Sequence, residues 1–132
     1  MNGIRTAIAA LMTSFEPWDV VKIPFPYPGG PAQENRPALV IAAGRLEASH
    51  ELLWVLMITS AGNPAWPTDV PITDLRSAGL PAPSVVRCAK ISTIATNHAQ
   101  KIGMLQRPAE RAAIARHLAL AVAPATGRQT NT

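Results

Sequence analysis

The segment Glu34-Asn35-Arg36-Pro37-Ala38-Leu39-Val40-Ile41 places an arginine where it could do chemistry. Pro37 fixes its own φ and favours an extended conformation for Arg36, and the apolar run after it is typical of a buried strand. The pattern predicts that Arg36 stands at the mouth of a strand, where its planar guanidinium could hold an anion through two parallel hydrogen bonds. A solvated or ion-paired surface arginine fits the same position, so position alone leaves both interpretations open.

Side chains that could transfer protons are few. His98 follows Thr96 and Asn97 in a turn-like stretch, where it could serve as an acid or base or be an exposed bystander. His117 is expected to pack at the edge of a helix face. A triad of Ser60, His98 and Asp69 can be drawn, but Ser60 lacks the context of a nucleophile elbow, so we disfavour serine catalysis.

Composition limits the function classes. The chain has 132 residues, which suits one domain with a single core, and hydrophobic residues make up 48% of it against 5% aromatic residues. Twelve Lys and Arg against eight Asp and Glu give a net charge of +4, and this balance favours anionic partners such as nucleic acid.

Cysteine and histidine usage bears on cofactors and compartment. The single Cys88, expected to be a small buried residue, cannot form an internal disulfide, and the three histidines show no zinc-ligand spacing. We therefore expect no metal or other cofactor. No run approaches the roughly 18 apolar residues of a membrane span, and the N-terminus lacks a convincing signal peptide, so a cytoplasmic protein without membrane contact is expected.

The elements that must position Arg36 are mostly short strands. Residues 1–14 are expected to form an N-terminal extension, residues 15–122 a single domain, and residues 123–132 a flexible tail. Strands are predicted at 18–23 (stopped by Pro24, Pro26 and Pro28 with the following Gly29-Gly30-Pro31), 37–43, 52–58, 69–72, 84–88, 90–94 and 101–105, a helical turn at 75–80 ending at Gly79, and a helix at 108–122. The segments 84–88 and 90–94 could be one bent strand. This order predicts a mainly β fold, a small and strongly bent sheet or barrel capped by a C-terminal helix.

Several short motifs occur in a familiar order. They are Pro17-Trp18-Asp19-Val20-Val21, Arg36-Pro37-Ala38-Leu39-Val40-Ile41, Ile58-Thr59-Ser60, Pro83-Ser84-Val85-Val86-Arg87, Lys90-Ile91-Ser92-Thr93-Ile94 and Ile102-Gly103-Met104-Leu105. Over about residues 15–105 the chain resembles the MazF/PemK toxins of bacterial toxin-antitoxin modules.

That resemblance implies an SH3-like barrel of the MazF/PemK/CcdB kind, a homodimer, and a metal-independent endoribonuclease that cleaves single-stranded mRNA at short motifs and arrests growth. It also implies inhibition by a cognate antitoxin protein. The functional Arg of the family falls on Arg36 and its functional Thr on Thr59, and residues 24–35 match its mobile first loop. Two departures are Trp18, where the family usually has Gly, and Glu34 with Asn35, where basic residues are common.

Under this resemblance, other residues become candidates for binding RNA. Lys22, Arg87 and Lys90 lie on or beside predicted strands and could form a phosphate track, although each could equally be a solvated charge. Trp66, in a predicted loop, is a candidate for stacking on an RNA base or for docking the antitoxin. Ser60 joins them beside Thr59, whereas Trp54, inside an apolar run, is expected in the core.

A second function class stays open. The same barrel could serve as a non-catalytic binding module, either a CcdB-like topoisomerase poison or a degenerate toxin homologue. Intact Arg36 and Thr59 favour the endoribonuclease, while the acidic Glu34 and the modest net charge leave room for the binding module.

Overall fold

The computed structural model describes residues 14–26, 33–47 and 50–127. Almost all of the predicted N-terminal extension, the centre of the 24–35 loop and the last five residues of the predicted tail lie outside the described residues. The domain boundaries at 15 and 122 stay a prediction.

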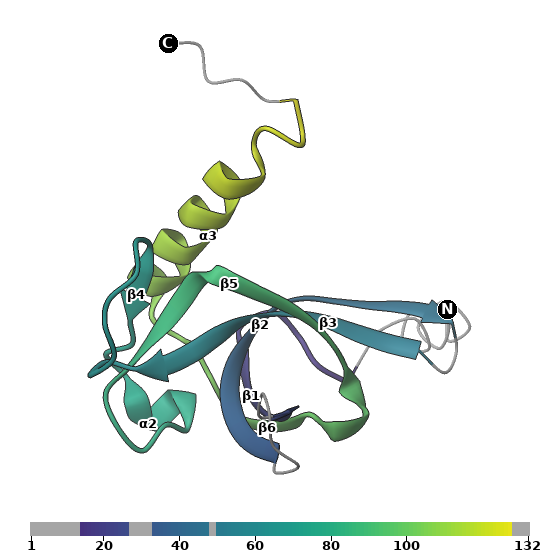
Figure 1. Ribbon diagram of the computed structural model, residues 1–132, viewed down its shortest axis with the longest axis horizontal. Coiled ribbons are helices and arrows are strands. Elements are labelled where there is room, and N and C mark those ends of the chain that lie inside the picture. The colour runs from purple at the N-terminus through teal and green to yellow at the C-terminus, as the bar shows by residue number, and fades with distance from the viewer. Residues whose placement is uncertain (1–13, 27–32, 48–49, 128–132) are drawn as a thin grey trace, which may run out of the picture.

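The described chain forms one curled antiparallel sheet with helices at one end (Figure 1). Along the chain the elements are β1 (Asp19–Pro26), β2 (Gln33–Glu47), β3 (His50–Ser60), β4 (Asp69–Pro71), α2 (Leu75–Ala78), β5 (Ser84–Ala95), the 3₁₀ turn η1 (Thr96–His98), β6 (Gln100–Met104) and α3 (Pro108–Val122). The strand order is β4-β5-β3-β2-β1-β6. The prediction of a mainly β, barrel-like fold with a C-terminal helix is confirmed, although the six-stranded sheet stays open between β4 and β6.

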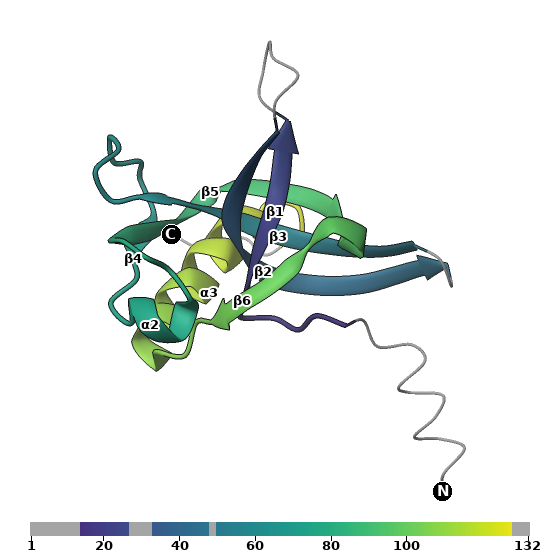
Figure 2. The same cartoon turned by 90° about the horizontal axis from the view of Figure 1, so that it is seen from below.

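Irregularities in the ladders bend this sheet. The register shifts between Val20 and Val21 in β1, between Val40 and Ala42 in β2, and between Leu56 and Met57 in β3. Extra residues of this kind kink a strand and increase its twist, so the sheet curls. The turned view in Figure 2 shows β1 and β2 crossing β3, with α2 and α3 gathered on the same side of the molecule.

The curl buries both faces of the central strands. Val20, Leu39 and Leu56 belong to a cluster closed by Ile114 of α3, whereas Val21 and Val40 belong to a second cluster on the opposite face. Neighbouring residues of one strand thus enter different cores. This explains why β2 and β3 read as continuous apolar runs rather than as alternating patterns.

The prediction that the first strand ends at Ile23 was wrong. β1 continues to Pro26, with Pro24 opposite Asn35, and β2 begins at Gln33. The pairing of β1 with β6 ends at Lys22 opposite Gln100, so among the described strands the later part of β1 pairs with β2 alone, and a proline is tolerated where no hydrogen bond is required. Arg36 therefore lies inside β2, opposite Ile23, and not at a strand's mouth.

The prediction that Trp54 lies in the core was also wrong, since 56% of its surface is exposed. Trp54 shares a face of β3 with Leu56, and the cluster that buries Leu56 ends there. It lies opposite Thr93 of β5, two residues along β5 from the exposed Ile91. Segments 84–88 and 90–94 are one strand, β5.

The C-terminal helix has its predicted bounds but packs through its first half. Ile114 is buried, while Val122, at the end of the helix, is 48% exposed. Arg111 donates from Nε to the Leu105 carbonyl at 2.7 Å and stacks over the Trp18 ring at 5.2 Å. No described helix is long and apolar enough to cross a membrane.

Trp18 shows why glycine suits its position. Its φ is 78°, in the left-handed region that favours glycine, and its backbone is fixed on both sides by hydrogen bonds to Val40 and Leu105 of 2.8 and 2.9 Å. The departure from the family pattern therefore falls on a backbone conformation that costs a bulky residue strain. Stacking of Arg111 on the indole is a contact that glycine could not make.

Candidate active site

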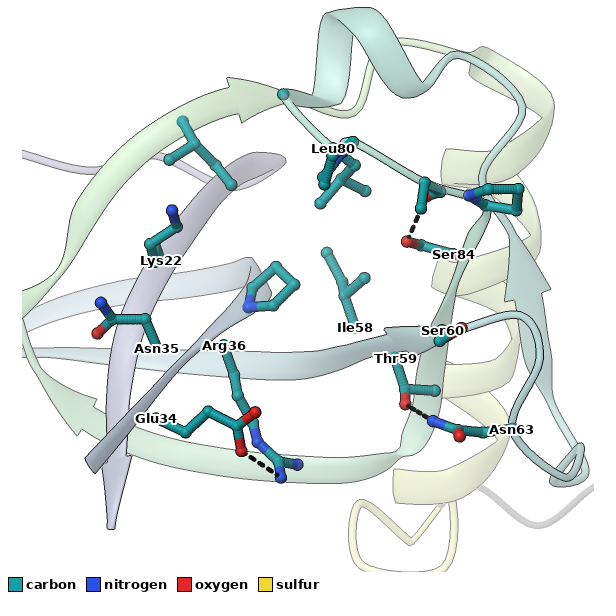
Figure 3. A pocket seen from close by; sticks show the side chains of 16 residues that line it. Lys22, Glu34, Asn35, Arg36, Ile58, Thr59, Ser60, Asn63, Leu80 and Ser84 are labelled. Carbon is teal, nitrogen blue, oxygen red and sulfur yellow. Dashed lines mark hydrogen bonds and ion pairs between the residues drawn. The ribbon is translucent and has the colours of Figure 1, made fainter. Parts of the chain in front are cut away.

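A pocket of about 480 Å³ opens where β2 separates from β3. Figure 3 shows the side chains of the 16 residues that line it. They are Lys22, Glu34, Asn35, Arg36, Pro37, Ile58, Thr59, Ser60, Asn63, Gly79, Leu80, Pro81, Ala82, Pro83, Ser84 and Ile102. Of the predicted site residues, the pocket thus brings together Arg36, Thr59, Lys22 and Ser60.

Strand pairing explains how Arg36 and Thr59 come to face one opening. The last pair of the β2–β3 ladder at this end is Ala38 with Met57, and the same register extended by two residues sets Arg36 opposite Thr59. Beyond that pair, β2 follows β1 and β3 follows β5, so the two strands diverge. Because alternate residues share a face, Arg36 and Thr59 lie on the face of Ala38 and Met57. We call the opening between the diverging ends of β2 and β3 the fork, and its two edges the lips. Arg36 lies on the β2 lip and Thr59 on the β3 lip.

Lys22 and Ile58 lie on the other face of the fork. Lys22 is opposite Pro37 in the β1–β2 ladder, and directly opposed residues point to the same face. Figure 3 shows Lys22 on the β1–β2 side, with Ile58 and Leu80 facing the space between the diverging strands. The pocket therefore has a charged side and an apolar side.

The segment from Gly79 to Ser84 closes the pocket opposite β2. Gly79 caps α2, as predicted, with a left-handed φ of 73°, and a Cβ there would overlap the Ile102 carbonyl. A Cβ on Gly103 of β6 would overlap the backbone of Ala78. These two glycines allow α2 and β6 to touch backbone to backbone, and this contact sets the place of the pocket wall.

The Arg36 guanidinium forms an exposed ion pair with Glu34. Its Nη2 lies 3.2 Å from Glu34 Oε2, and the two side chains are 45% and 56% exposed. Among the described residues this is the only hydrogen bond of its guanidinium, so further N–H donors stay open to an anion.

The hydroxyl groups opposite are aligned by their own loop. Thr59 Oγ1 accepts a hydrogen bond of 2.7 Å from Asn63 Nδ2, and Ser60 Oγ accepts one of 3.2 Å from the Gly62 N–H. Each hydroxyl is an acceptor in these contacts, so its proton can be donated outward to a ligand oxygen. Asn63 and Asn35 were not predicted; the turn Gly62-Asn63-Pro64 after a strand was the signal that could have indicated Asn63.

Arg87 lies outside the pocket and is 8% exposed. Its Nε and Nη2 donate to the Asp69 carboxylate at 3.2 and 3.1 Å, Nη2 donates to the Pro64 carbonyl at 2.8 Å, and the guanidinium stacks on Trp66 at 4.2 Å. Burial acts to raise the pKa of Asp69, but hydrogen bonds from Arg87 and Trp66 and the charge of Arg87 hold that pKa below its ordinary value. The geometry assigns Arg87 to fixing the loop between β3 and β4.

The remaining candidates are scattered. Lys90 is exposed on β5 and Trp66 is 43% exposed, and neither lines the pocket. Asp69 of the drawn triad is engaged by Arg87, and the His98 side chain lies outside the described residues. Cys88 is buried, as expected, and burial with the nearby Asp69 charge raises the pKa of its thiol to about 11. A thiol of this kind is a poor nucleophile at neutral pH.

The arrangement fits a phosphodiester. An arginine fork with open donors, a lysine and two outward hydroxyls are groups that bind phosphate oxygens. Among the residues that the structure describes, the lining contains neither histidine nor cysteine, and Glu34 is its one carboxylate.

Comparisons with known proteins agree with this architecture. No curated protein sequence matches the chain. The Mycobacterium tuberculosis toxin MazF-mt6 is 22% identical over 80% of this chain and 95% of its own, with a TM-score of 0.55. A structure described as an Mtb toxin is 24% identical over 65% of this chain and 91% of its own, with a TM-score of 0.50. These likenesses show the fold. The sequence profile of the PemK-like, MazF-like toxins of type II toxin-antitoxin systems matches residues 16–122, and the chain therefore belongs to this family.

Proposed function

We propose that this protein is a toxin that cleaves single-stranded mRNA at specific sequences, without a metal ion, and so arrests growth. The observation that carries the proposal is the meeting of Arg36 and Thr59 at the two lips of one pocket, although 22 positions separate them in the sequence. The motifs Arg36-Pro37-Ala38-Leu39-Val40-Ile41 and Ile58-Thr59-Ser60, on which the resemblance was based, both contribute residues to this pocket.

The proposed chemistry uses a neighbouring group of the substrate. The 2′-OH of a ribose attacks the adjacent phosphorus, the P–O5′ bond breaks, and negative charge gathers on the non-bridging oxygens. The open donors of Arg36 stabilise that charge, and the Thr59 hydroxyl donates to the same phosphate from the opposite lip. Lys22 and Ser60 hold neighbouring parts of the RNA backbone as point contacts.

Partners follow from the family. Type II systems pair a toxin with an antitoxin, so we propose a cognate antitoxin protein as a second partner beside RNA, in the cytoplasm. We also propose a homodimer. The exposed Trp54 and Ile91, adjacent on one face of the β3–β5 ladder, support it, because large apolar side chains exposed side by side suit an interface.

One observation favours the non-catalytic alternative. Glu34 already pairs with Arg36, and its charge opposes that of the RNA. A binding module would tolerate this pairing, because it need not stabilise a transition state.

Cleavage by purified protein separates the two functions. A long single-stranded RNA is incubated in EDTA with the wild type and with Arg36→Ala. Removing one preorganised donor commonly costs on the order of 3 kcal/mol, so we expect discrete fragments from the wild type and a rate lower by ~10² for the variant. Arg116→Ala, an exposed change on α3, is the matched control and should cleave normally. Absence of cleavage by folded wild type on several RNAs would favour the binding module.

A further inference from the structure

The pocket raises the question of which group removes the proton from the attacking 2′-OH. In the described part of the chain, its lining contains three charged residues, Lys22, Glu34 and Arg36. A protonated lysine or arginine has no lone pair to offer, and the hydroxyls of Thr59 and Ser60 are weak bases. Glu34 is therefore the lining side chain with the chemistry of a general base.

The position of Glu34 fits that role. Two positions before Arg36 on β2, it projects to the same face, which is also the face of Thr59 on the opposite lip. Its Oε2 lies 3.2 Å from Arg36 Nη2, and Figure 3 shows the carboxylate and the guanidinium side by side at the mouth of the pocket. A phosphodiester bound by the remaining donors of Arg36 lies next to this carboxylate.

We propose that Glu34 is the general base of the RNA cleavage proposed above, on which this inference rests. The carboxylate takes the proton of the 2′-OH as the 2′-oxygen forms its bond to phosphorus. The P–O5′ bond breaks, the 5′-oxygen takes a proton from water, and the products are a 2′,3′-cyclic phosphate and a 5′-OH. Glu34 then returns its proton to solvent. Arg36 has two effects here, since it stabilises the phosphate charge and keeps the carboxylate beside it.

A competing role for Glu34 makes the opposite prediction. If the carboxylate only neutralised Arg36, its removal would free the guanidinium and strengthen both RNA binding and cleavage. If the carboxylate is the base, its removal slows cleavage while RNA binding is unchanged or tighter. The sign of the change in rate thus separates the two roles.

The experiment measures single-turnover cleavage of a short RNA that contains one cut site identified with the wild type. Glu34→Gln keeps the size of the side chain and removes its basicity, and we expect the rate at saturating protein to fall about 10²-fold or more, with no loss of RNA affinity. Glu34→Asp should retain an intermediate rate. Glu16→Gln makes the same charge change at an exposed carboxylate outside the pocket and should cleave like the wild type.

The pH dependence gives a second readout. Among the described residues, Arg36 on β2 is the charged group on the face of Glu34; Lys22 on β1 lines the pocket from the other face of the fork, and β3, β6 and the segment 79–84 contribute no charged side chain to the lining. The wild-type rate should rise with pH along an acid limb as the carboxylate ionises, and Glu34→Gln should lack that limb. An acid limb unchanged in the Gln variant would overturn the assignment.

A substrate with sulfur in place of the 5′-oxygen tells a base from an acid. The sulfur leaves without needing a proton, so loss of a general acid is rescued by this substrate and loss of a general base is not. We expect Glu34→Gln to stay slow on it, and restoration of the rate would make Glu34 an acid instead.

Failure of the inference and failure of the proposed function are distinguishable. An active wild type with an equally fast or faster Glu34→Gln variant overturns the base alone. A folded wild type that cleaves no RNA overturns both.

Discussion

Two arginine–carboxylate pairs in this molecule have similar contact distances but differ in exposure, in sequence separation and in the number of other contacts that hold the guanidinium. Arg36 and Glu34 are neighbours in sequence, about half exposed, and joined by one contact of 3.2 Å at the mouth of the pocket. Arg87 and Asp69 come from different strands, and their side chains are each 10% exposed. The Arg87 guanidinium donates two hydrogen bonds to Asp69 and one to the Pro64 carbonyl, and it stacks on the Trp66 ring. Arg36 is available to bind a ligand, whereas the hydrogen bonds of Arg87 are all made within the fold.

The contrast shows what distinguishes a functional cation from a structural one. Both arginines follow or precede apolar strand residues, so their local sequences look alike. The difference lies in the partner, because a carboxylate two residues away moves with the arginine, while one that is 18 residues away ties two segments together. Only the fold reveals which of these applies.

Removal of Arg87 should have the largest effect on stability. Arg87→Ala removes the charge and both side-chain hydrogen bonds that pair with the largely buried Asp69 carboxylate, and breaking such a pair commonly costs about 3 kcal/mol of unfolding free energy. Urea unfolding measures it. Lys90→Ala, an exposed change on the same strand, is the control and should leave the midpoint unchanged. An Arg87→Ala protein as stable as the wild type would contradict the structural role of Arg87.

The pocket wall provides a second test of the rigid support. A methyl group on Gly103 would overlap the backbone of Ala78, so Gly103→Ala should lower the unfolding free energy by about 2 kcal/mol. Gly44→Ala in β2 is a matched control, because nothing lies within 4 Å of the added Cβ. Equal midpoints for the two variants in thermal or urea unfolding would show that α2 can move away from β6 without cost.

Acid should weaken the Arg87 pair. Because the pKa of Asp69 is held below its ordinary value of 3.8, its carboxylate stabilises the fold fully above that pH and loses its effect as the pH falls through the lower folded-state pKa. Asp69→Asn should cost about 1.5 kcal/mol at neutral pH, since it loses a charged hydrogen bond. The stability difference from wild type should then narrow as the pH drops below about 4. A constant difference down to pH 2 would contradict this account.

The Arg36 pair should contribute little to stability. Exposed pairs typically contribute between 0 and about 1 kcal/mol, so we expect Glu34→Gln to shift the unfolding free energy by at most about 0.5 kcal/mol. In thermal unfolding, about 1 M salt should make this small difference smaller still, since salt screens exposed charges. A loss comparable to that of Arg87→Ala would make Glu34 a structural residue.

The sequence was sufficient for the local features of the fold. Pro108 at the helix start and Gly79 at the end of α2 are signals that depend on the backbone of a few residues, and both elements formed as predicted. Trp54 shows the limit. Its apolar run is real, but burial also requires a covering element, and nothing in a strand's own sequence tells where the cover ends.

The candidate site divides in the same way. Arg36 and Thr59 were predicted from the order of motifs, and strand register then brings them to one pocket. Arg87 looked like a third phosphate ligand because its pairing with Asp69 is a long-range contact. The sequence did not identify a general base. The role proposed for Glu34 depends on its sharing a face of the fork with Arg36 and Thr59, and strand register alone shows this.

The most direct test of the account measures RNA cleavage and unfolding on the same preparations of Arg36→Ala and Arg87→Ala. We predict that Arg36→Ala unfolds like the wild type and cleaves about 10²-fold more slowly. Arg87→Ala should unfold more easily yet cleave at close to the wild-type rate under conditions where it is fully folded. A folded Arg36→Ala protein with normal cleavage, or a folded Arg87→Ala protein without cleavage, would contradict the assignment of function to one arginine and support to the other.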